Sequence, residues 1–299
     1  MSTQSAKKYP IIVSLVIIAL FGIGWWLLRD AHLPVLSPSG SIASQQRDLI
    51  VFTVVLALVV VVPVFVMLAV FAWRYRDGAK AHYQPEWADN KKLEFIWWGI
   101  PIAIIILLSV VTYITSHSLD PYKPIQSTKP ALEVQVVALQ WKWLFIYPDQ
   151  KIATINDLTI PAGRPVHFNL SADAPMSAFW VPALGGQIYT MGAMNSQLHL
   201  IADHQGVYDG YNTNINGQGY AKMTFKVNAL SDEKFETWVK NFDGSNHVLN
   251  QMHFDEIRQP SIEPMPMYMR LEDQNLYHNI VMKQMNSTSD SKQHEGHGM

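Results

Sequence analysis

Hydrophobic residues are concentrated in three long runs in the N-terminal part of the chain. They occupy residues 11–28 (IIVSLVIIALFGIGWWLL), 50–73 and 95–115, and none of the runs contains a charged residue. About 20 apolar residues are needed to cross the hydrocarbon core of a bilayer, and the second and third runs reach that length. The pattern therefore predicts a transmembrane helical hairpin at 39–116, with spans at about 50–73 and 95–115.

The first run has the features of a secretion signal, because a basic start precedes its apolar middle. A small-x-small cleavage site does not follow it, since Arg29 and Asp30 come directly after the run. Residues 1–30 are therefore a signal or an uncleaved anchor helix, and the missing cleavage site favours the anchor.

Lysine and arginine residues beside the spans predict their orientation. Only two basic residues lie between the first and second runs. Five lie between the second and third runs, namely Arg74, Arg76, Lys80, Lys91 and Lys92. Because basic residues near a span favour the cytoplasmic side, we expect this segment in the cytoplasm. Everything after residue 116 is then expected outside, in the periplasm of a bacterial inner membrane.

Beyond residue 116 the hydrophobic pattern changes from continuous to alternating. In KMTFKV, Met223, Phe225 and Val227 alternate with polar residues, as in a half-buried strand. The segments LEVQVVAL, SAFWVPAL and SQLHLIAD predict further short strands, and Gly and Pro turns separate them. We therefore expect an antiparallel β-sandwich or barrel at 117–230.

The last 69 residues have a third kind of pattern. SDEKFETWVKNF has a capping serine and acids in a first helical turn, and it places Phe235 and Trp238 on one face. This predicts a helical, aromatic-containing region at 231–285. The polar sequence of 286–299 predicts a disordered tail.

Composition excludes several kinds of chemistry. The chain of 299 residues has no cysteine, which rules out disulfides, thiolate metal sites, thiol catalysis and lipid attachment through cysteine. The net charge of −2 gives no electrostatic reason to expect nucleic acid as a partner. His167 and His199 show no ligand spacing, so ordinary polar roles are expected for them.

Three sequence motifs resemble those of one membrane-protein family. QWKWLFIYP begins the predicted external domain, VPALG lies in its middle, and DGYNTNINGQGYAKM follows. With two anchoring helices before them, they resemble subunit II of haem–copper respiratory oxidases, from about Ser39 to Lys283. The resemblance implies that residues 117–230 form a cupredoxin-like antiparallel β-sandwich.

The resemblance also implies a lost copper centre. In the cytochrome c oxidases of this family the loop has the pattern C-x3-C-x3-H-x2-M and holds two copper ions. Here these positions fall on Asn212, Asn216, Tyr220 and Met223, and the upstream histidine position is Ser177. One thioether cannot hold copper, because such centres depend on thiolate and imidazole ligands. Asparagine and tyrosine can instead close the loop through hydrogen bonds, so no metal is expected.

Loss of this centre marks the quinol oxidases of the superfamily, and LGGQIYTMGAM resembles their cytochrome bo-type branch. The resemblance implies a non-redox subunit of a proton-translocating ubiquinol oxidase. Haem b, haem o or a, copper and the quinone would belong to subunit I, and smaller subunits III and IV would complete the complex. One departure is the missing lipobox cysteine, which favours retention of the first helix.

Three residues carry both a structural and a functional interpretation. Trp141 and Trp143 match tryptophans associated with electron entry in copper-bearing relatives, but without an acceptor we expect packing or interface roles. Glu94 lies where the third run enters the membrane. It is either a first-turn acid stabilised by the helix N-terminus or, as the resemblance implies, the mouth of a proton channel in subunit I.

Two other functions compete with this interpretation. A copper-bearing cytochrome c oxidase subunit is contradicted by the absence of cysteine. A membrane-anchored binding or assembly protein with a decayed cupredoxin domain stays open on the sequence alone.

Overall fold

The computed structural model divides the chain into two units, residues 1–37 and 38–299. The structure describes residues 22–23, 26, 34–76, 90–242, 247–262 and 265–295, with side chains described up to residue 285. The signal or anchor predicted at 1–30 therefore lies almost wholly outside the described residues.

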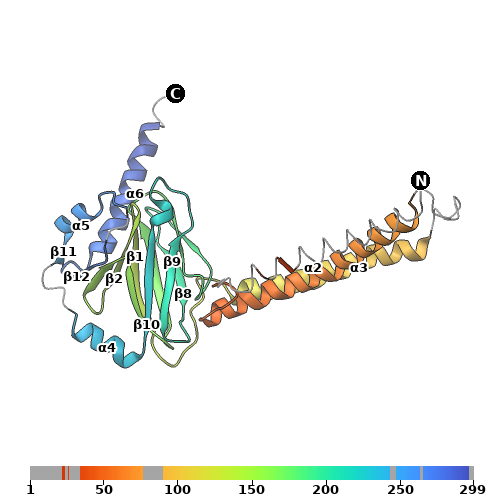
Figure 1. Cartoon of the computed structure of the whole chain (residues 1–299). Helices are drawn as coiled ribbons and strands as arrows, with labels where there is room; N and C mark the ends of the chain where they lie inside the picture. The colour runs from red at the N-terminus through yellow and green to blue at the C-terminus, as the bar shows by residue number, and fades with distance from the viewer. Residues whose placement is uncertain are drawn as a thin grey trace. The chain divides into compact units, whose positions relative to one another are not determined.

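Two long helices begin the second unit (Figure 1). Helix α2 spans Ser41–Arg74 and α3 spans Lys91–Ser118, and both are long and apolar enough to cross a membrane. With 34 and 28 residues they measure about 50 and 42 Å. Both exceed a hydrocarbon core of about 30 Å, so their ends extend past the two apolar runs. The predicted pair of membrane helices is confirmed.

Within the described residues, the external domain contains two β-sheets. The larger sheet contains, in spatial order, β11 (Val248–Leu249), β12 (Met267–Leu271), β3 (Ile152–Ile155), β2 (Lys142–Tyr147), β1 (Leu132–Leu139), β5 (Val166–Ala172) and β8 (Ser196–Leu200). The smaller sheet contains β4 (Asp157–Pro161), β10 (Thr224–Leu230), β9 (Gly206–Asn212), β6 (Ser177–Trp180) and β7 (Ile188–Thr190). Most neighbouring strands are antiparallel, and three pairs are parallel: β1 with β5, β10 with β4, and β11 with β12.

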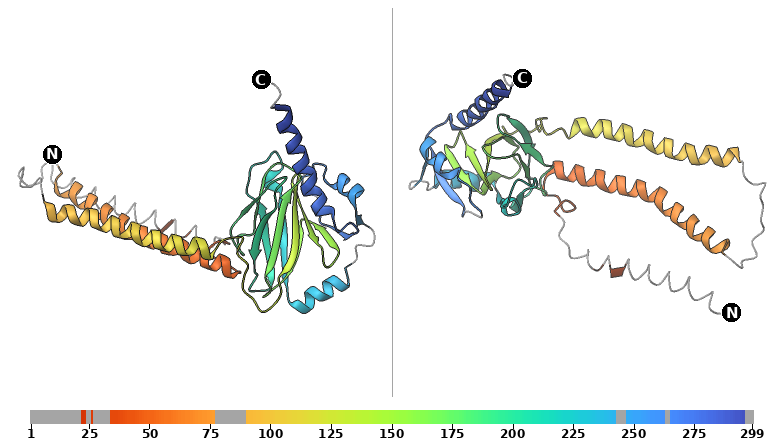
Figure 2. Two further views of the ribbon diagram at one scale, coloured as in Figure 1. Left: turned by 180° about the vertical axis from the view of Figure 1, so that it is seen from behind. Right: turned by 90° about the horizontal axis from the view of Figure 1, so that it is seen from above.

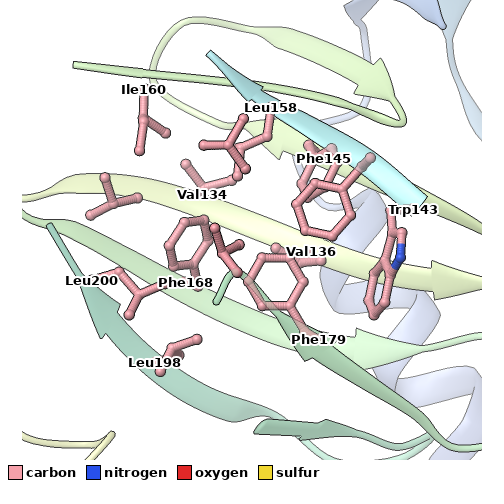
Figure 3. Packing of buried hydrophobic residues seen from close by; sticks show 14 of the residues in the cluster. Val134, Val136, Trp143, Phe145, Leu158, Ile160, Phe168, Phe179, Leu198 and Leu200 are labelled. Atoms are coloured by element: carbon pink, nitrogen blue, oxygen red, sulfur yellow. The ribbon is translucent and has the colours of Figure 1, made fainter. Parts of the chain in front are cut away.

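The two sheets enclose an aromatic core (Figure 3). The ring of Phe179 lies 5.1–6.4 Å, between centroids, from those of Trp143, Phe145, Phe168 and Phe225. All five side chains are buried. The alternation of KMTFKV has the predicted cause, since Phe225 and Val227 enter this core. The predicted cupredoxin-like sandwich is confirmed.

The outer face of the larger sheet is also covered, by the C-terminal part of the chain (Figure 2). The predicted helices are present as α4 (Asp232–Lys240), α5 (Gln251–Ile257) and α6 (Leu276–Glu295). The side chain of Ser231 caps α4 by accepting from the backbone N–H of Lys234. Strands β11 and β12 also lie in this region and extend the sheet beyond β3. The sequence pattern did not predict these two strands.

Helix α6 continues into 286–299, the segment for which polar composition predicts disorder. Its first turns are anchored by the buried side chains of Leu276, Tyr277 and Ile280. Lys, Gln and Glu, which follow, are good helix formers, so an anchored helix can propagate past its apolar part. Residues 296–299 lie outside the described residues.

Candidate functional site

The five positions matching copper ligands lie close together at one end of the smaller sheet. Ser177 begins β6 and Asn212 ends β9, and these strands pair with each other. Asn216 lies in the loop that follows β9, and its Nδ2 donates to Ser177 Oγ over 2.8 Å. Tyr220 begins a short 3-10 turn, and Met223 directly precedes β10.

Asn212 is the centre of a hydrogen-bond network at this corner. Its Oδ1 accepts from the backbone N–H groups of Ala178 at 2.9 Å and Asn214 at 3.1 Å. Its Nδ2 donates to the Asn214 carbonyl at 3.0 Å and to Asn216 Oδ1 at 3.2 Å. The residue is only 7% exposed, so all four hydrogen-bonding positions of this buried amide are satisfied within the protein.

Met223 and Tyr220 have no part in that amide network. The Met223 side chain is fully buried in the aromatic core, and its carbonyl accepts from the Asn212 backbone N–H at 3.0 Å. Tyr220 is half-buried, and its backbone N–H donates to the Gly217 carbonyl.

The side chains at this corner do not fit a two-copper centre. A hydroxyl, two amides, a phenol and a thioether replace the soft thiolates and imidazoles on which such a centre depends. The amides and the hydroxyl are already bonded to one another. Over the described part of the chain, no group of three or more His, Asp or Glu residues is placed to hold a metal ion.

The two tryptophans have different positions beside this corner. Trp143 is fully buried between the sheets, against Phe179 and Phe225. Trp141 has a positive φ of 68° and packs against the loop that carries Asn216. A Cβ at Gly219 would come within 2.4 Å of the Trp141 ring, so the loop backbone approaches the indole as only glycine permits.

Glu94 lies far from this corner in sequence, in the first turn of α3. Asn90 caps the helix, with its Oδ1 accepting from the backbone N–H groups of Lys92 and Leu93. The Glu94 side chain is exposed. Its position satisfies the interpretation as a first-turn acid, while the preceding segment 77–89 lies outside the described residues.

Comparisons with known proteins agree with the motifs. The family model for the transmembrane domain of cytochrome c oxidase subunit II matches residues 31–114. The cytochrome bo(3) ubiquinol oxidase subunit 2 of Pseudomonas putida is 43% identical, over 86% of this chain and 81% of the relative. The ubiquinol oxidase subunit 2 of Acetobacter aceti is 41% identical, over 87% of this chain and 85% of the relative.

The chain belongs to the ubiquinol oxidase subunit 2 family.

A solved structure gives a weaker match to the external domain. The periplasmic domain of subunit II of cytochrome oxidase from Bradyrhizobium japonicum is 20% identical, with a TM-score of 0.37. It covers 38% of this chain and 95% of that domain.

Membership in this family confirms the resemblance stated from the sequence motifs. The chain is anchored in a membrane by two helices and carries a C-terminal domain outside the bilayer. The side chains at the five positions that match copper ligands differ from the ligand pattern of a copper-bearing subunit.

One residue of the corner was missed by sequence reasoning. Asn214 lies between the ligand positions, so the copper spacing passes over it. Its Nδ2 donates to the Met176 carbonyl at 2.7 Å, and its backbone forms two bonds with the Asn212 side chain. The signal was available in the sequence, because NTNIN places three asparagines at alternate positions.

Proposed function

We propose that this chain is the non-redox subunit II of a proton-translocating terminal quinol oxidase. The complex would oxidise quinol, reduce oxygen to water and move protons outward. The hydrogen-bonded network of Ser177, Asn212 and Asn216 carries this proposal. It fills the place of an electron-accepting copper centre, so the subunit would support subunit I without receiving electrons.

The redox cofactors would then lie in other chains. Haem b, haem o or a, copper and the bound quinone are assigned to subunit I, and subunits III and IV complete the complex. The relatives' names support ubiquinol as the donor. The lysine and arginine counts support a bacterial inner-membrane protein whose large C-terminal domain is periplasmic.

Metal analysis of the separated chain tests this proposal. The purified complex should oxidise ubiquinol and reduce oxygen but should not oxidise reduced cytochrome c. Subunit II separated from that complex should contain no copper and should show no near-infrared absorption. One or two copper ions bound per separated chain would contradict the proposal.

A quadruple substitution tests whether the corner retains its ancestral geometry. Ser177→His, Asn212→Cys, Asn216→Cys and Tyr220→His restore the ligand pattern around Met223. The variant should bind copper and acquire the purple colour of a mixed-valence centre, while the unchanged protein should not. A folded variant that binds no copper would show that the loop has lost the geometry of a metal site.

Glu94 is proposed to supply protons to the channel of subunit I. The orientation argument puts it on the cytoplasmic side, where an oxygen-reducing enzyme takes up protons, and a carboxylate can exchange them with water. Glu94→Ala should leave assembly and haem content intact but slow quinol oxidation several-fold, with Glu94→Asp milder.

Asn90→Ala is the matched control, because it removes the helix cap and keeps the carboxylate. A purely helix-stabilising role for Glu94 predicts that Asn90→Ala slows turnover as much as Glu94→Ala. Normal turnover by a fully assembled Glu94→Ala enzyme across a range of pH would also contradict a proton-supply role.

A further inference from the structure

A cavity of about 330 Å³ lies where the two membrane helices meet the sandwich. Its walls come from the first turns of α2, from residues 118–121 and 123–126 at and after the end of α3, from Gly186, and from residues 198–200 of β8. Its volume is within the range of small-molecule sites. Its lining includes none of the five positions that match copper ligands, and the proposed function gives it no role.

Hydrogen bonds attach the chain on either side of the cavity to the sandwich. The backbone N–H groups of Ser39 and Gly40 donate to the Ala183 carbonyl at 2.7 and 3.1 Å, which attaches α2 to the sandwich. The His199 backbone N–H donates to the Pro121 carbonyl at 3.1 Å, and His199 Nδ1 lies 3.1 Å from the same oxygen. The segment after α3 is therefore bonded directly to β8.

His199 also belongs to a row of polar residues that crosses the outer face of the larger sheet. Glu133, His167 and His199 occupy paired positions on β1, β5 and β8. His167 Nδ1 lies 2.8 Å from Glu133 Oε1, and the two imidazole rings are stacked with centroids 4.4 Å apart. His199 is only 8% exposed. His199, which lines the cavity, is therefore supported by His167 and Glu133 on the neighbouring strands.

The position of the cavity along the helices gives its depth in a membrane. Gln45 lines the cavity and precedes Ile50, the start of the apolar run, by five residues or about 7 Å of helix. Ser118 follows the end of the other run by three residues, or about 4–5 Å. The headgroup layer on each side of a bilayer is roughly 5–8 Å thick. The cavity therefore lies at headgroup level, outside the hydrocarbon core.

The charges at the cavity are balanced. Lys123 provides one positive charge and Asp120 one negative charge. They lie in one turn, in which the Lys123 backbone N–H donates to the Asp120 carbonyl at 3.0 Å. Ser41, Gln45 and Gln46 add uncharged donors, while Ile42, Leu198 and Leu200 add apolar surface. A ligand with both charges and an apolar part is complementary to this lining.

We propose that this cavity binds the headgroup of a zwitterionic phospholipid. The phosphate faces Lys123 and the headgroup ammonium faces Asp120. Ser41, Gln45 and Gln46 provide donors for the ester oxygens, and the acyl chains continue into the bilayer beside α2 and α3. A quinol headgroup is uncharged and leaves both charges unpaired. An anionic lipid is disfavoured, because its net negative charge lies close to the Asp120 carboxylate.

Native mass spectrometry of the intact, delipidated oxidase complex tests the proposal. Phosphatidylethanolamine is added to the unchanged complex and to complexes carrying Lys123→Gln, Asp120→Asn or Lys129→Gln. Lys129 is the matched control, because it lies outside the cavity and pairs with Asp232. Haem content and quinol oxidase turnover confirm that each complex is assembled.

One equivalent of phosphatidylethanolamine should bind to the unchanged complex and to the Lys129→Gln complex. Removal of one charge-assisted contact should weaken that binding about 10- to 100-fold in Lys123→Gln. A photoactivatable analogue of the lipid should label residues 41–46 or 118–126. Equal binding to Lys123→Gln, or labelling confined to other segments, would overturn the proposal.

Two further measurements distinguish phosphatidylethanolamine from an anionic lipid and from free phosphate. Phosphatidylglycerol should bind more weakly than phosphatidylethanolamine, and Asp120→Asn should reduce that preference. Tighter binding of the anionic lipid, unaffected by Asp120→Asn, would contradict a zwitterionic site. Inorganic phosphate should not displace the lipid at equal concentration, and displacement would show a free-anion site instead.

Discussion

Both faces of the larger sheet are buried around β2, but they are covered in different ways. Its inner face packs against the smaller sheet through large aromatic side chains. Its outer face packs against the C-terminal elements through mainly aliphatic residues such as Leu144, Ile146 and Ile280. The whole of β2 is buried for this reason. The C-terminal region is therefore part of the folded domain.

Polar ties distinguish the outer face further. The Asp173 carboxylate pairs with Arg258, at 2.7 Å between Oδ2 and Nε, and accepts from Gln284 Nε2 of α6. Lys142 Nζ donates to the Gln259 carbonyl at 2.8 Å and to Ser261 Oγ at 2.6 Å. Burial lowers the pKa of Lys142. Packing on the inner face depends on the fit of apolar side chains, whereas packing on the outer face combines apolar contacts with charged and polar ones.

The largest expected effect comes from removing the centre of the inner face. Phe179→Ala leaves a cavity among four aromatic rings, and such substitutions lower the free energy of unfolding by about 3–5 kcal/mol. Urea unfolding of the detergent-solubilised chain, followed by tryptophan fluorescence, measures the loss. Val207→Ala is the control, because Val207 is 67% exposed. A loss below about 1 kcal/mol for Phe179→Ala would contradict a shape-dependent core.

A smaller effect is expected at the polar tie of the outer face. Asp173→Ala leaves Arg258 without its buried partner, since the Asp173 side chain is 3% exposed. Breaking a fully buried pair costs about 3–5 kcal/mol, and the 29% exposure of Arg258 reduces our expectation to about 2–3 kcal/mol. Hydrogen exchange should accelerate first in α5 and α6.

Asp255→Ala provides the matched control for this tie. Asp255 also approaches Arg258, at 3.6 Å, but its side chain is 49% exposed. The substitution should change the free energy of unfolding by less than about 1 kcal/mol. Equal losses for the two aspartates would show that the tie does not depend on burial.

Sequence patterns predicted the core between the two sheets better than the outer face of the larger sheet. KMTFKV alternates because one face of β10 meets the core and the other meets solvent. KWLFIY does not alternate, and its continuous apolar run is typical of a strand buried on both faces. The partner on its second face lies more than 100 residues away in α6. Periodicity alone could not identify that partner.

The candidate site was predictable in its residues but not in its contacts. The copper-ligand spacing identified Ser177, Asn212 and Asn216, although they are up to 39 residues apart. Their hydrogen bonds depend on the pairing of β6 with β9, which a single sequence does not specify. The proton-supply role of Glu94 stays a prediction, because it depends on a second subunit.

A third prediction concerns the hydrogen-bonded corner and compares Asn212 with Asn216. Asn212→Ala removes an amide with four hydrogen bonds and leaves buried backbone groups unpaired, at a cost of about 1–3 kcal/mol. Asn216→Ala should cost less, because Asn216 is less buried and its side chain forms two hydrogen bonds, one with Asn212 and one with Ser177. Urea unfolding of both variants measures the order. A larger loss for Asn216→Ala would place the centre of the network elsewhere.

The smallest expected effect concerns the edge of the outer face, where the segment after α3 covers β8. Burial lowers the pKa of His199, and the nearby His167 lowers it further. The Pro121 carbonyl and the Glu133 carboxylate act in the opposite direction. The native state therefore prefers neutral His199. Below the unfolded-state pKa of about 6.5, the unfolded chain binds more protons at this residue than the native chain.

Stability should consequently decrease as pH falls below about 6.5, and part of this decrease should depend on His199. Urea unfolding at several pH values measures the slope, and His199→Gln should make it shallower. His204→Gln is the control, because His204 is exposed and lies outside the row formed by Glu133, His167 and His199. An unchanged slope in His199→Gln would show that this edge is held by its backbone hydrogen bonds alone, in contrast to the charged tie at Asp173.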